Sequence, residues 1–398
     1  MERLIAREPE ELWEKQGIAV KVLHEVKEVD LKQGRVHLQE QGNPKTWWEP
    51  FDHLMMATGA LPLKPPVENI EARGIFGVGT LESGLDVISF VEEIQPKRAV
   101  VIGGGYIGLE MAENLVLRKM DVSLIERAPE VMGTLDPDMG RRVSEALMDV
   151  GVKLYREESL EAFELSADRV KQVITDKRTL PADLVILGMG VKPNTALAEE
   201  AGIKLGVTGA VEVDHTMRTG TDNVWAGGDC AESFHLLSRR PVTIALGTVA
   251  NKHGRVAGTN IGGGYAAFPG LVGTAVSKIC SLEVARTGLQ EKEIQQTGRE
   301  YVSAVIESKT RAGYYPGAGG IAVKVLAEKG TGRLLGGQIV GMEGAAKRID
   351  ILATALHAGF TLEEVADLDL SYAPPYSPVW DPVALAARVG MKKLRGDG

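Results

Sequence analysis

Residues 100–110 read VVIGGGYIGLE, an apolar strand followed by glycines at positions 103, 105 and 108 and then by helical spacing. The strand is predicted over 98–102 and the helix over 106–118. In this pattern the first glycine permits a tight turn, the second lets a pyrophosphate approach the backbone, and the third lets the helix pack on the strand. The free N–H groups at the start of the helix attract the phosphates. The stretch predicts a dinucleotide-binding unit, against the alternative of a glycine-rich turn without a ligand.

The residues around this turn refine the prediction. Glu126 ends the next predicted strand, 23 residues after Gly103, where a carboxylate binds ribose hydroxyls. It would repel a 2′-phosphate and so favours NADH over NADPH, although the neighbouring Arg127 weakens that preference. Tyr106 either covers a nicotinamide or packs on the sheet edge. Glu110 either points toward the nicotinamide or is a solvated helix glutamate.

The composition is that of a globular protein with two or three domains. The 398 residues are 25% charged and 44% hydrophobic, and the net charge of −9 without a long basic run argues against nucleic acid. No apolar stretch approaches the ~18–20 residues that span a bilayer, and the charged start MERLIAREPEELWEK is not a signal peptide. The two cysteines, Cys230 and Cys280, lie far apart without metal-type spacing, so we expect a cytoplasmic chain with neither disulfide nor metal.

An order of elements recurs along the chain. The first sixty residues repeat the helix, strand, meander and strand that follow the glycine fingerprint, with the first of these strands predicted over 17–23. Gly17 matches Gly151 and Gly59 matches Gly190, at offsets of 134 and 131. The two stretches therefore form an internal repeat.

The first copy of this repeat is incomplete. In the second copy the fingerprint begins 48 residues before Gly151, and the same distance before Gly17 falls at position −31, outside the chain. The strand, glycine turn and first helix of copy one are thus absent, and a helix predicted over 9–16 comes first. We expect the sequence to begin at an internal methionine of a longer protein.

Three further motifs follow predicted apolar strands, at the strand ends where open α/β sheets bind ligands. They are Thr58-Gly59, Gly188-Met189-Gly190 and Gly227-Gly228-Asp229. Ordinary strand-ending turns explain the first two as well. In the third, the carboxylate can bind ribityl hydroxyls while the glycines admit a phosphate, or the aspartate caps a helix.

The pattern changes near residue 274 to that of an antiparallel α+β domain. Before this change a helix is predicted over 243–261. After it, strands are predicted over 275–285 and 301–306, a hairpin over 321–340 with its turn at 330–332, and helices over 345–358. The aromatic segments 311–317 and 371–382 contain prolines that exclude a helix. Each forms either a plug in the core or the wall of a binding site.

The chain resembles the pyridine nucleotide–disulfide oxidoreductase family through ordered motifs at 57–59, 100–110, 187–194, 225–232 and 282–289. The two aromatic segments are similar to those of its coenzyme A-disulfide reductase branch, whose relatives include NADH oxidases, NADH peroxidases and persulfide reductases. The resemblance implies an α/β fold with two Rossmann-like domains, the first incomplete at its N-terminus, and a C-terminal α+β dimerisation domain. The implied division is an FAD-binding part at 1–79, an NAD(P)-binding domain at 80–204, an FAD-binding return at 205–273 and a dimerisation domain at 274–398.

The resemblance also implies FAD and NADH or NADPH as cofactors, with NADH favoured, and a homodimer. The cofactor-binding residues it implies are Thr58, Gly59, Gly103, Gly105, Tyr106, Ile107, Gly108, Glu110, Glu126, Gly188, Gly190, Gly228 and Asp229. Tyr314 and Tyr372 would approach the substrate from the partner subunit as catalytic residues. The family's redox cysteine has no counterpart, since neither Cys230 nor Cys280 lies at its place.

The implied activity is reduction of coenzyme A disulfide or a related small disulfide. Hydride would pass from NAD(P)H to flavin and on to a cysteine mixed disulfide, for which this sequence lacks the cysteine. An NADH oxidase or diaphorase, and a redox-inactive NAD-binding dimerisation protein, are the alternatives. The sequence leaves open whether the electron acceptor is a disulfide, peroxide, oxygen or a persulfide.

Overall fold

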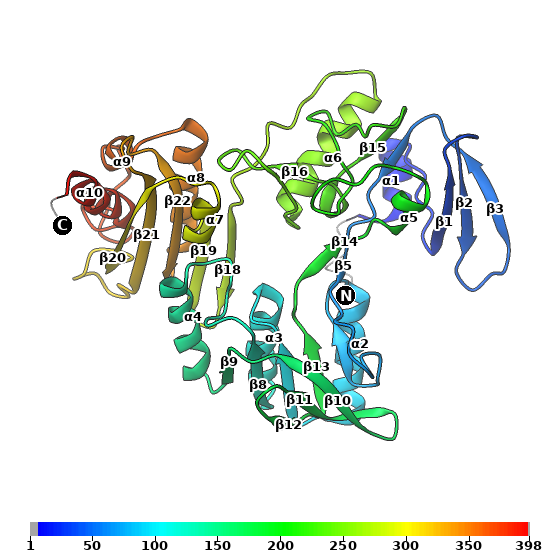
Figure 1. The fold of residues 1–398 in the computed structure, drawn as a ribbon, viewed down its shortest axis with the longest axis horizontal. Helices are drawn as coiled ribbons and strands as arrows, with labels where there is room; N and C mark the ends of the chain where they lie inside the picture. Colours follow the sequence, from blue (N-terminus) through cyan, green and yellow to red (C-terminus); the bar gives the residue numbers. More distant parts are fainter. Residues whose placement is uncertain (1–6, 397–398) are drawn as a thin grey trace. The chain divides into compact units, whose positions relative to one another are not determined.

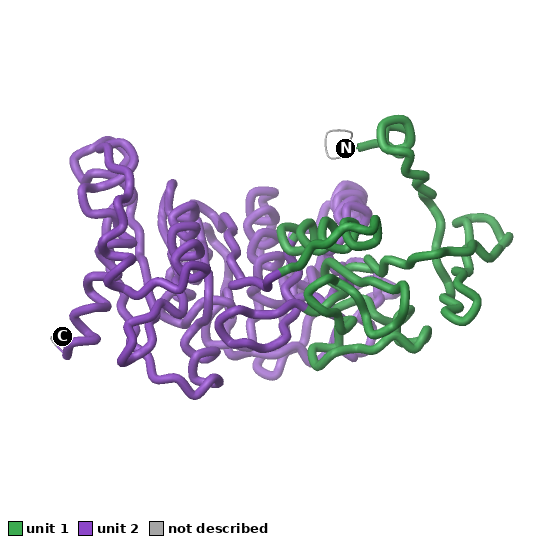
Figure 2. The backbone as a smooth tube through the Cα atoms, turned by 90° about the horizontal axis from the view of Figure 1, so that it is seen from above, with its two compact units in different colours: residues 1–59, 193–232, 247–268 green, residues 60–192, 233–246, 269–398 purple. Residues whose placement is uncertain are grey.

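The computed structural model describes residues 7–396, which divide into two compact units (Figure 2). Unit 1, green in Figure 2, comprises the described residues up to 59 together with 193–232 and 247–268. Unit 2, purple, comprises 60–192, 233–246 and the described residues from 269. No helix within 7–396 is long and apolar enough to cross a membrane.

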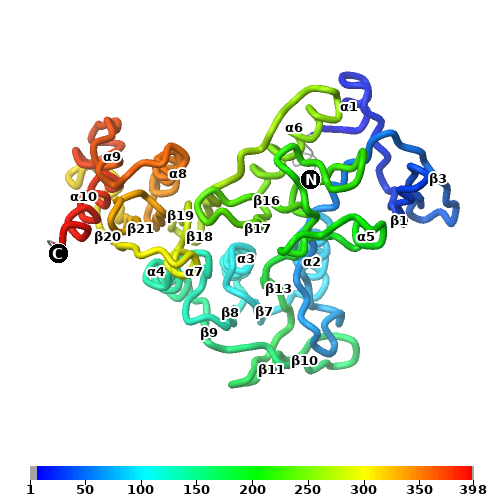
Figure 3. The backbone as a smooth tube through the Cα atoms, turned by 45° about the horizontal axis from the view of Figure 1, so that its top comes forward, coloured from blue at the N-terminus to red at the C-terminus, as the bar shows by residue number. Residues whose placement is uncertain are grey.

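A parallel sheet in the order β6-β13-β7-β8-β9 forms the first part of unit 2 (Figure 1). Nearly all residues of β7 (Arg98–Ile102) and β13 (Leu184–Leu187) are buried, as expected of strands covered on both faces. Helix α3 (Tyr106–Leu117) packs along β7 and β8 (Figure 3). The other elements are β6 (Ile75–Gly77), α2 (Leu81–Ile94), β8 (Asp121–Glu126), α4 (Pro137–Asp149) and β9 (Lys153–Arg156).

Small sheets accompany the parallel sheet. An antiparallel sheet contains β10, β11 and β12, β5 pairs with β14, and β16 pairs with β17. Their bounds are β5 (Ala60–Pro62), β10 (Leu160–Ser166), β11 (Arg169–Thr175), β12 (Thr179–Pro181), β14 (Val191–Pro193), β16 (Ser233–Phe234) and β17 (Pro241–Val242).

The C-terminal part of unit 2 is an antiparallel sheet in the order β18-β19-β22-β21-β20. Every residue of β22 (Leu334–Gly341) is buried, and α8 and α10 supply much of the core beside it. The remaining elements are β18 (Ala275–Ile279), β19 (Leu282–Gly288), α7 (Glu291–Gln296), β20 (Tyr301–Lys309), β21 (Gly320–Glu328), η3 (Ala346–Arg348), α8 (Ile349–Ala358), α9 (Leu362–Ala366) and α10 (Pro382–Arg395). The predicted antiparallel α+β pattern is confirmed.

Unit 1 contains a three-stranded antiparallel sheet, β1-β2-β3, and a separate parallel pair, β4 with β15. The meander β1-β2-β3 corresponds to β10-β11-β12 in unit 2, as the internal repeat predicts. Its elements are α1 (Pro9–Gln16), β1 (His24–Asp30), β2 (Arg35–Glu40), β3 (Thr46–Pro50), β4 (Leu54–Met56), α5 (Ala196–Glu200), β15 (Val224–Ala226), η2 (Gly228–Cys230) and α6 (Gly247–Ile261).

The strand predicted over 17–23 is wrong. Residues 17–21 have no regular structure and 22–23 form a turn, with Ile18, Val20 and Val22 each 41–58% exposed. An alternating apolar pattern forms a strand only where a neighbouring strand accepts its hydrogen bonds. Within the described part of the chain, no strand pairs with residues 17–23.

Two further details differ from the sequence prediction. The helix expected from Thr243 begins at Gly247, and residues 243–246 instead line a cavity in unit 2. Helices α2 and α10 were not predicted, although Thr80 caps the first and Asp381 caps the second by accepting backbone N–H bonds.

A buried lysine connects helix α4 with the C-terminal sheet of unit 2. Lys324 on β21 is 2% exposed, and its Nζ lies 3.1 Å from Asp136, 2.8 Å from Asp138 and 2.8 Å from Glu291. Burial opposes the charged amine, but the bonds to Asp138 and Glu291 outweigh it and raise the pKa of Lys324. Gln338 on β22 completes the cluster by donating to Asp136 over 2.7 Å. The start of α4 is thereby tied to the C-terminal sheet.

We expect Lys324→Met to lower the free energy of unfolding by about 3–5 kcal/mol, because it leaves the buried carboxylate of Asp136 without its cation. Urea unfolding at pH 7 measures this change. Since the pKa is raised above its usual 10.5, the contribution is present below that pH and is lost as pH rises through the raised pKa. The control is Lys329→Met, whose lysine is 62% exposed and which should change stability by less than about 0.5 kcal/mol. Equal effects of the two substitutions would contradict the prediction.

Candidate functional site

The glycine turn after β7 is packed against the end of β13. Gly103 has φ +100°, and a Cβ on Gly108 would lie 2.0 Å from the carbonyl oxygen of Gly103. A Cβ on Gly188 would lie 2.7 Å from the Cα of Gly108. Strand, turn and helix therefore approach at a distance that only glycine permits at these three positions.

This packing does not require a glycine at position 105. Its φ of −81° suits any residue, and the nearest atom to a Cβ there is the oxygen of Gly188 at 3.7 Å. Gly105 is also the N-cap of α3, where no side chain satisfies the first N–H groups. Open space before a helix N-terminus fits a pyrophosphate, so the residues present are suited to a dinucleotide.

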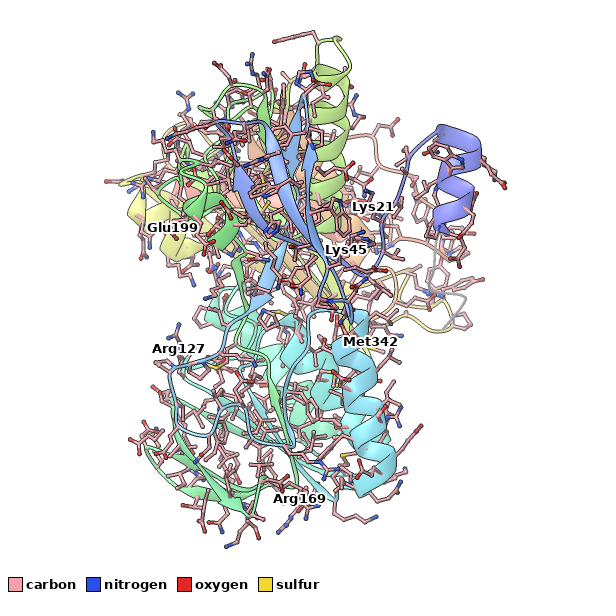
Figure 4. The ribbon with its side chains drawn as sticks, turned by 90° about the vertical axis from the view of Figure 1, so that its right-hand side faces the viewer. Lys21, Lys45, Arg127, Arg169, Glu199 and Met342 are labelled. Carbon is pink, nitrogen blue, oxygen red and sulfur yellow. The ribbon has the colours of Figure 1, made fainter. Side chains whose placement is uncertain are left out.

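The carboxylate of Glu126 lies against the same turn. It accepts the N–H of Gly104 over 2.7 Å and the N–H of Ala128 over 2.8 Å. Each oxygen keeps a further lone pair for a ribose hydroxyl. Arg127 is exposed (Figure 4).

Tyr106 lines a cavity of about 520 Å³ within unit 2. Its hydroxyl accepts a hydrogen bond from Thr134 over 3.2 Å. The other lining residues include Thr134, His235, residues 240–246, Arg286 and Glu293. Burial lowers the pKa of His235, so this imidazole favours its neutral form. Tyr106 thus lines a cavity, and its contact with a nicotinamide stays a prediction.

Glu110 and Ile107 lie on the same helix as Tyr106. Glu110 is exposed and accepts a hydrogen bond from the hydroxyl of Ser277 on β18 over 2.7 Å. Ile107 is partly buried. Gly190, beyond β13, has φ +95° and accepts the N–H of Leu63 over 2.9 Å. Cofactor contact by these three residues stays a prediction.

The predicted flavin residues of unit 1 follow the parallel strands β4 and β15. Thr58 donates its hydroxyl to the carbonyl of Asn194 over 2.5 Å, and the N–H of Asn194 donates to the carbonyl of Gly59 over 2.9 Å. Gly59 has φ +70°, and a Cβ there would meet no atom within 4 Å. Two predicted residues, Thr58 and Gly59, thus lie after β4 and are hydrogen-bonded to Asn194.

Gly228 and Asp229 follow the neighbouring strand. The N–H of Gly228 donates to Nδ1 of His253 over 3.3 Å, and burial lowers the pKa of that histidine to about 4. Burial also raises the pKa of Asp229. No hydrogen bond from residues 7–396 reaches the Asp229 carboxylate. A partly buried carboxylate with free lone pairs fits the hydroxyl groups of a flavin side chain.

Neither cysteine has the surroundings of a reactive thiolate. Cys230 is fully buried and donates to the carbonyls of Gly227 and Met56. Burial, with the charge of Glu113, raises the pKa of Cys280 to about 11. The thiol of Cys280 is therefore protonated near neutral pH, whereas a nucleophile requires the thiolate, and the thiol of Cys230 is shielded from solvent.

The two aromatic segments of unit 2 are joined by a buried arginine. Arg348 donates to the carbonyls of Thr310 and Tyr376, each over 2.8 Å, and forms an ion pair with Asp381 at 2.9 Å. Tyr314 and Tyr372 are 78% and 48% exposed, and their hydrogen bond raises the pKa of Tyr372. The aromatic segments thus form an exposed wall rather than a core plug.

Sequence reasoning missed several residues that contact the predicted site. Asn194 stands in the motif LGMGVKPN, so a signal for it was present. No sequence signal marked His253 or Thr134, because a histidine within a helix and a threonine in a loop have no distinctive pattern. Arg286 stands in the motif at 282–289, so a signal for it was present, although no spacing along the sequence predicts that it reaches the cavity from a different sheet.

Family models identify the class of protein. The model for pyridine nucleotide-disulphide oxidoreductases matches residues 3–254, and the model for the dimerisation domain of that family matches residues 274–383. The chain belongs to this family and is a flavin-dependent oxidoreductase that uses NAD(P)H. The predicted family, fold class and enzyme class are confirmed.

Individual relatives agree with this assignment. A Pyrococcus horikoshii NAD(P)H coenzyme A polysulfide/persulfide reductase is 38% identical over 397 residues, covering 98% of this chain and 86% of its own. An NADH oxidase of Methanocaldococcus jannaschii is 37% identical, covering 98% and 87%. The structure of an NAD-dependent persulfide reductase from A. fulgidus matches with a TM-score of 0.95 and 40% identity, over 99% of this chain and 73% of that one.

A pair of alanine substitutions separates binding from packing in the glycine turn. We expect Gly105→Ala to fold with a stability change below about 0.5 kcal/mol but to bind NADH at least about tenfold more weakly, because the new methyl group occupies the open space. Gly108→Ala should lower stability by about 1–3 kcal/mol or more, since its Cβ overlaps Gly103. Urea unfolding and titration of NADH fluorescence measure the two effects. Unchanged NADH affinity in Gly105→Ala would remove the case for a dinucleotide at this turn.

Proposed function

We propose that this protein transfers electrons from NADH, through FAD, to a disulfide or persulfide of coenzyme A or another small thiol. The observation that carries the proposal is the open Gly105, at a helix N-terminus whose other glycines are required by packing. For a disulfide the reaction is NADH + H⁺ + RSSR → NAD⁺ + 2 RSH. The substrate class is supported by the names of the persulfide reductases described above.

We assign NADH rather than NADPH to the turn because of Glu126. Its carboxylate is fixed by two backbone N–H groups and so cannot swing away from an incoming ribose. A 2′-phosphate would meet this negative charge at short range, whereas a 2′-hydroxyl would donate to it. Gly103, Gly105 and Gly108 would hold the pyrophosphate, and Tyr106 would adjoin the nicotinamide.

The flavin would be held by residues of unit 1. When bound, FAD supplies a two-electron acceptor for the hydride of NADH. Asp229 would accept hydrogen bonds from hydroxyl groups of the cofactor, while Gly228 and Gly59 would let its backbone pass closely. Thr58 would be fixed at that position by Asn194. In unit 2, Gly188 and Gly190 would lie beside the bound nicotinamide nucleotide.

A second candidate is an NADH oxidase or diaphorase, which needs no cysteine. The observation in its favour is that Cys230 is fully buried and that burial, with the charge of Glu113, raises the pKa of Cys280 to about 11. The relative named NADH oxidase is consistent with it. One experiment distinguishes the two candidates.

We further propose that the chain acts as a homodimer, with domain boundaries near 79, 204 and 273. The aromatic wall around Tyr314 and Tyr372 is the surface that a second copy would cover. Its exposed members include Tyr314, Tyr372, Tyr376, Val379 and Trp380. Tyrosine and tryptophan are enriched in protein interfaces, and in the dimer Tyr314 and Tyr372 would reach the partner's substrate.

The deciding experiment adds NADH without oxygen to protein reconstituted with FAD, and then adds coenzyme A disulfide. We expect NADH to bleach the flavin absorbance and the disulfide to restore it, with two thiols released per NADH. Recovery with oxygen alone, without thiol release, would establish the oxidase. A flavin spectrum that NADH leaves unchanged would contradict both redox functions.

Val379→Glu tests the dimer. Val379 is 71% exposed, and an unpaired carboxylate buried in an interface should weaken association at least about tenfold. Sedimentation velocity over a range of protein concentrations measures this change. The control is Tyr265→Glu, whose tyrosine is 82% exposed in unit 1 and should leave the dimer intact. A monomeric wild-type chain, or equal behaviour of the two variants, would exclude this interface.

A further inference from the structure

A second cavity of unit 2 lies apart from the glycine turn. Its volume is about 750 Å³, and its walls come from α4, from the ends of β20 and β22, from the start of β21 and from Arg311 and Gly313. Helix α4 packs beside this sheet (Figure 1). Among the described residues, none lines both this cavity and the one that contains Tyr106. The two cavities are therefore separate sites.

The wall of the second cavity is partly apolar and partly bare backbone. Its lining residues include Leu282, Ile321 and Val340. Gly320, at the start of β21, lines it as well, and a Cβ there would meet no atom within 4 Å. Its φ lies outside the left-handed region, so neither packing nor backbone strain requires a glycine. Gly341 on the neighbouring strand differs, because a Cβ there would lie 2.8 Å from the carbonyl oxygen of Gly320. The wall at Gly320 thus leaves room for a ligand.

One arginine of this cavity has an unsatisfied donor. The Nε of Arg142 on α4 is buried and has no hydrogen-bond partner within residues 7–396, whereas its Nη2 donates to Glu307 on β20 over 2.7 Å. A guanidinium presents these two N–H groups side by side, and together they bind both oxygens of one carboxylate. Glu307 occupies only one of the two positions. Because a buried N–H without an acceptor costs free energy, the arginine favours an oxyanion that accepts from both groups.

Glu307 is a weak competitor for this arginine. Its side chain is 72% exposed. The hydrogen bond from Arg142 lowers the pKa of Glu307, so the carboxylate is charged at neutral pH. An ion pair with an exposed partner contributes little to stability, because water screens the charges and the side chains lose freedom in forming it. A ligand carboxylate can therefore displace Glu307 at little cost.

The remaining charges of the cavity limit the charge of its ligand. Lys309 and Arg311 add two cations, and Glu145 and Asp149 on α4 add two carboxylates. Together with the arginine–glutamate pair these charges balance, so the cavity does not favour a polyanion. A single carboxylate that takes the place of Glu307 keeps the balance. The apolar part of the wall is then free to contact an apolar body.

We propose that this cavity binds a small organic acid with one carboxylate and an apolar body, and that Arg142 holds the carboxylate through Nε and Nη2 in place of Glu307. Its volume lies within the range of about 300–1,000 Å³ that is usual for small-molecule sites. The site is separate from those proposed for the nucleotide and the flavin. The inference therefore goes beyond the proposed function and does not depend on it.

The probe is benzoate, which joins one carboxylate to an apolar ring. Ligand-observed NMR titration of the full chain at pH 7 measures its dissociation constant. Arg142→Gln should weaken benzoate binding at least about tenfold, because it removes a charged donor pair. The control is Arg141→Gln, the neighbouring arginine on α4, which is 68% exposed and does not line the cavity. This control should leave the affinity unchanged.

Two further variants separate the roles of the side chains. Glu307→Gln removes the competing carboxylate, so benzoate should bind about 2- to 5-fold more tightly, the scale of one exposed ion pair. Glu300→Gln, whose glutamate is 78% exposed beside Lys329, is its control and should change nothing. Gly320→Val fills the open wall and should weaken binding while Arg142 stays in place. It keeps the test valid if Arg142→Gln does not fold.

Absence of saturable benzoate binding to the wild-type chain would overturn the proposal, as would unchanged affinity in both Arg142→Gln and Gly320→Val. Weaker binding in Glu307→Gln would also overturn it, since Glu307 would then belong to the site and not compete for it. Tighter binding of phenyl phosphate than of benzoate would assign the cavity to a dianion and so exclude a monocarboxylate. These titrations use neither NADH nor FAD, so their outcome is independent of the proposed redox function.

Discussion

A charged amine is stable inside a protein only where carboxylates surround it, and Lys324 meets this condition with groups from two distant stretches of chain. Asp136 and Asp138 stand at the start of α4, and Glu291 stands at the start of α7. The cluster therefore fixes two helix starts relative to β21 at once. The connection that carries Thr134 ends at this cluster, so the environment of the glycine turn depends on a lysine outside the nucleotide-binding sheet.

The nucleotide site is defined as much by missing side chains as by those present. Gly103, Gly108 and Gly188 let three backbone segments meet with no room for a methyl group. This contact directs the N-terminus of α3 toward the space beside Gly105. In the proposed function, Glu126 would favour a ribose without a 2′-phosphate. Some glycines of the motif are thus required by packing, while Gly105 leaves space for a ligand. The sequence alone does not distinguish these glycines.

The sequence predicted the parallel unit well, because each of its elements has a local signature. Strand β7 has the predicted bounds, and α3 ends one residue earlier than predicted. The strand over 17–23 failed because strand formation requires a neighbour, which a local pattern does not report. Arg286 and Lys324 escaped prediction for a related reason. The contacts of Arg286 with Thr134 and of Lys324 with Asp138 span more than 150 residues, and hydrophobic periodicity carries no information on such contacts.

Arg348 has a consequence for how quickly two copies of this chain can recognise one another. It binds the carbonyl of Thr310, just before segment 311–317, and that of Tyr376 in the other segment, and it is held by Asp381. Both aromatic segments are therefore ordered in the single chain. Conformational entropy that a flexible surface would lose during association has already been lost on folding. An encounter between copies then needs only the correct orientation and no rearrangement of loops, which favours docking as rigid bodies.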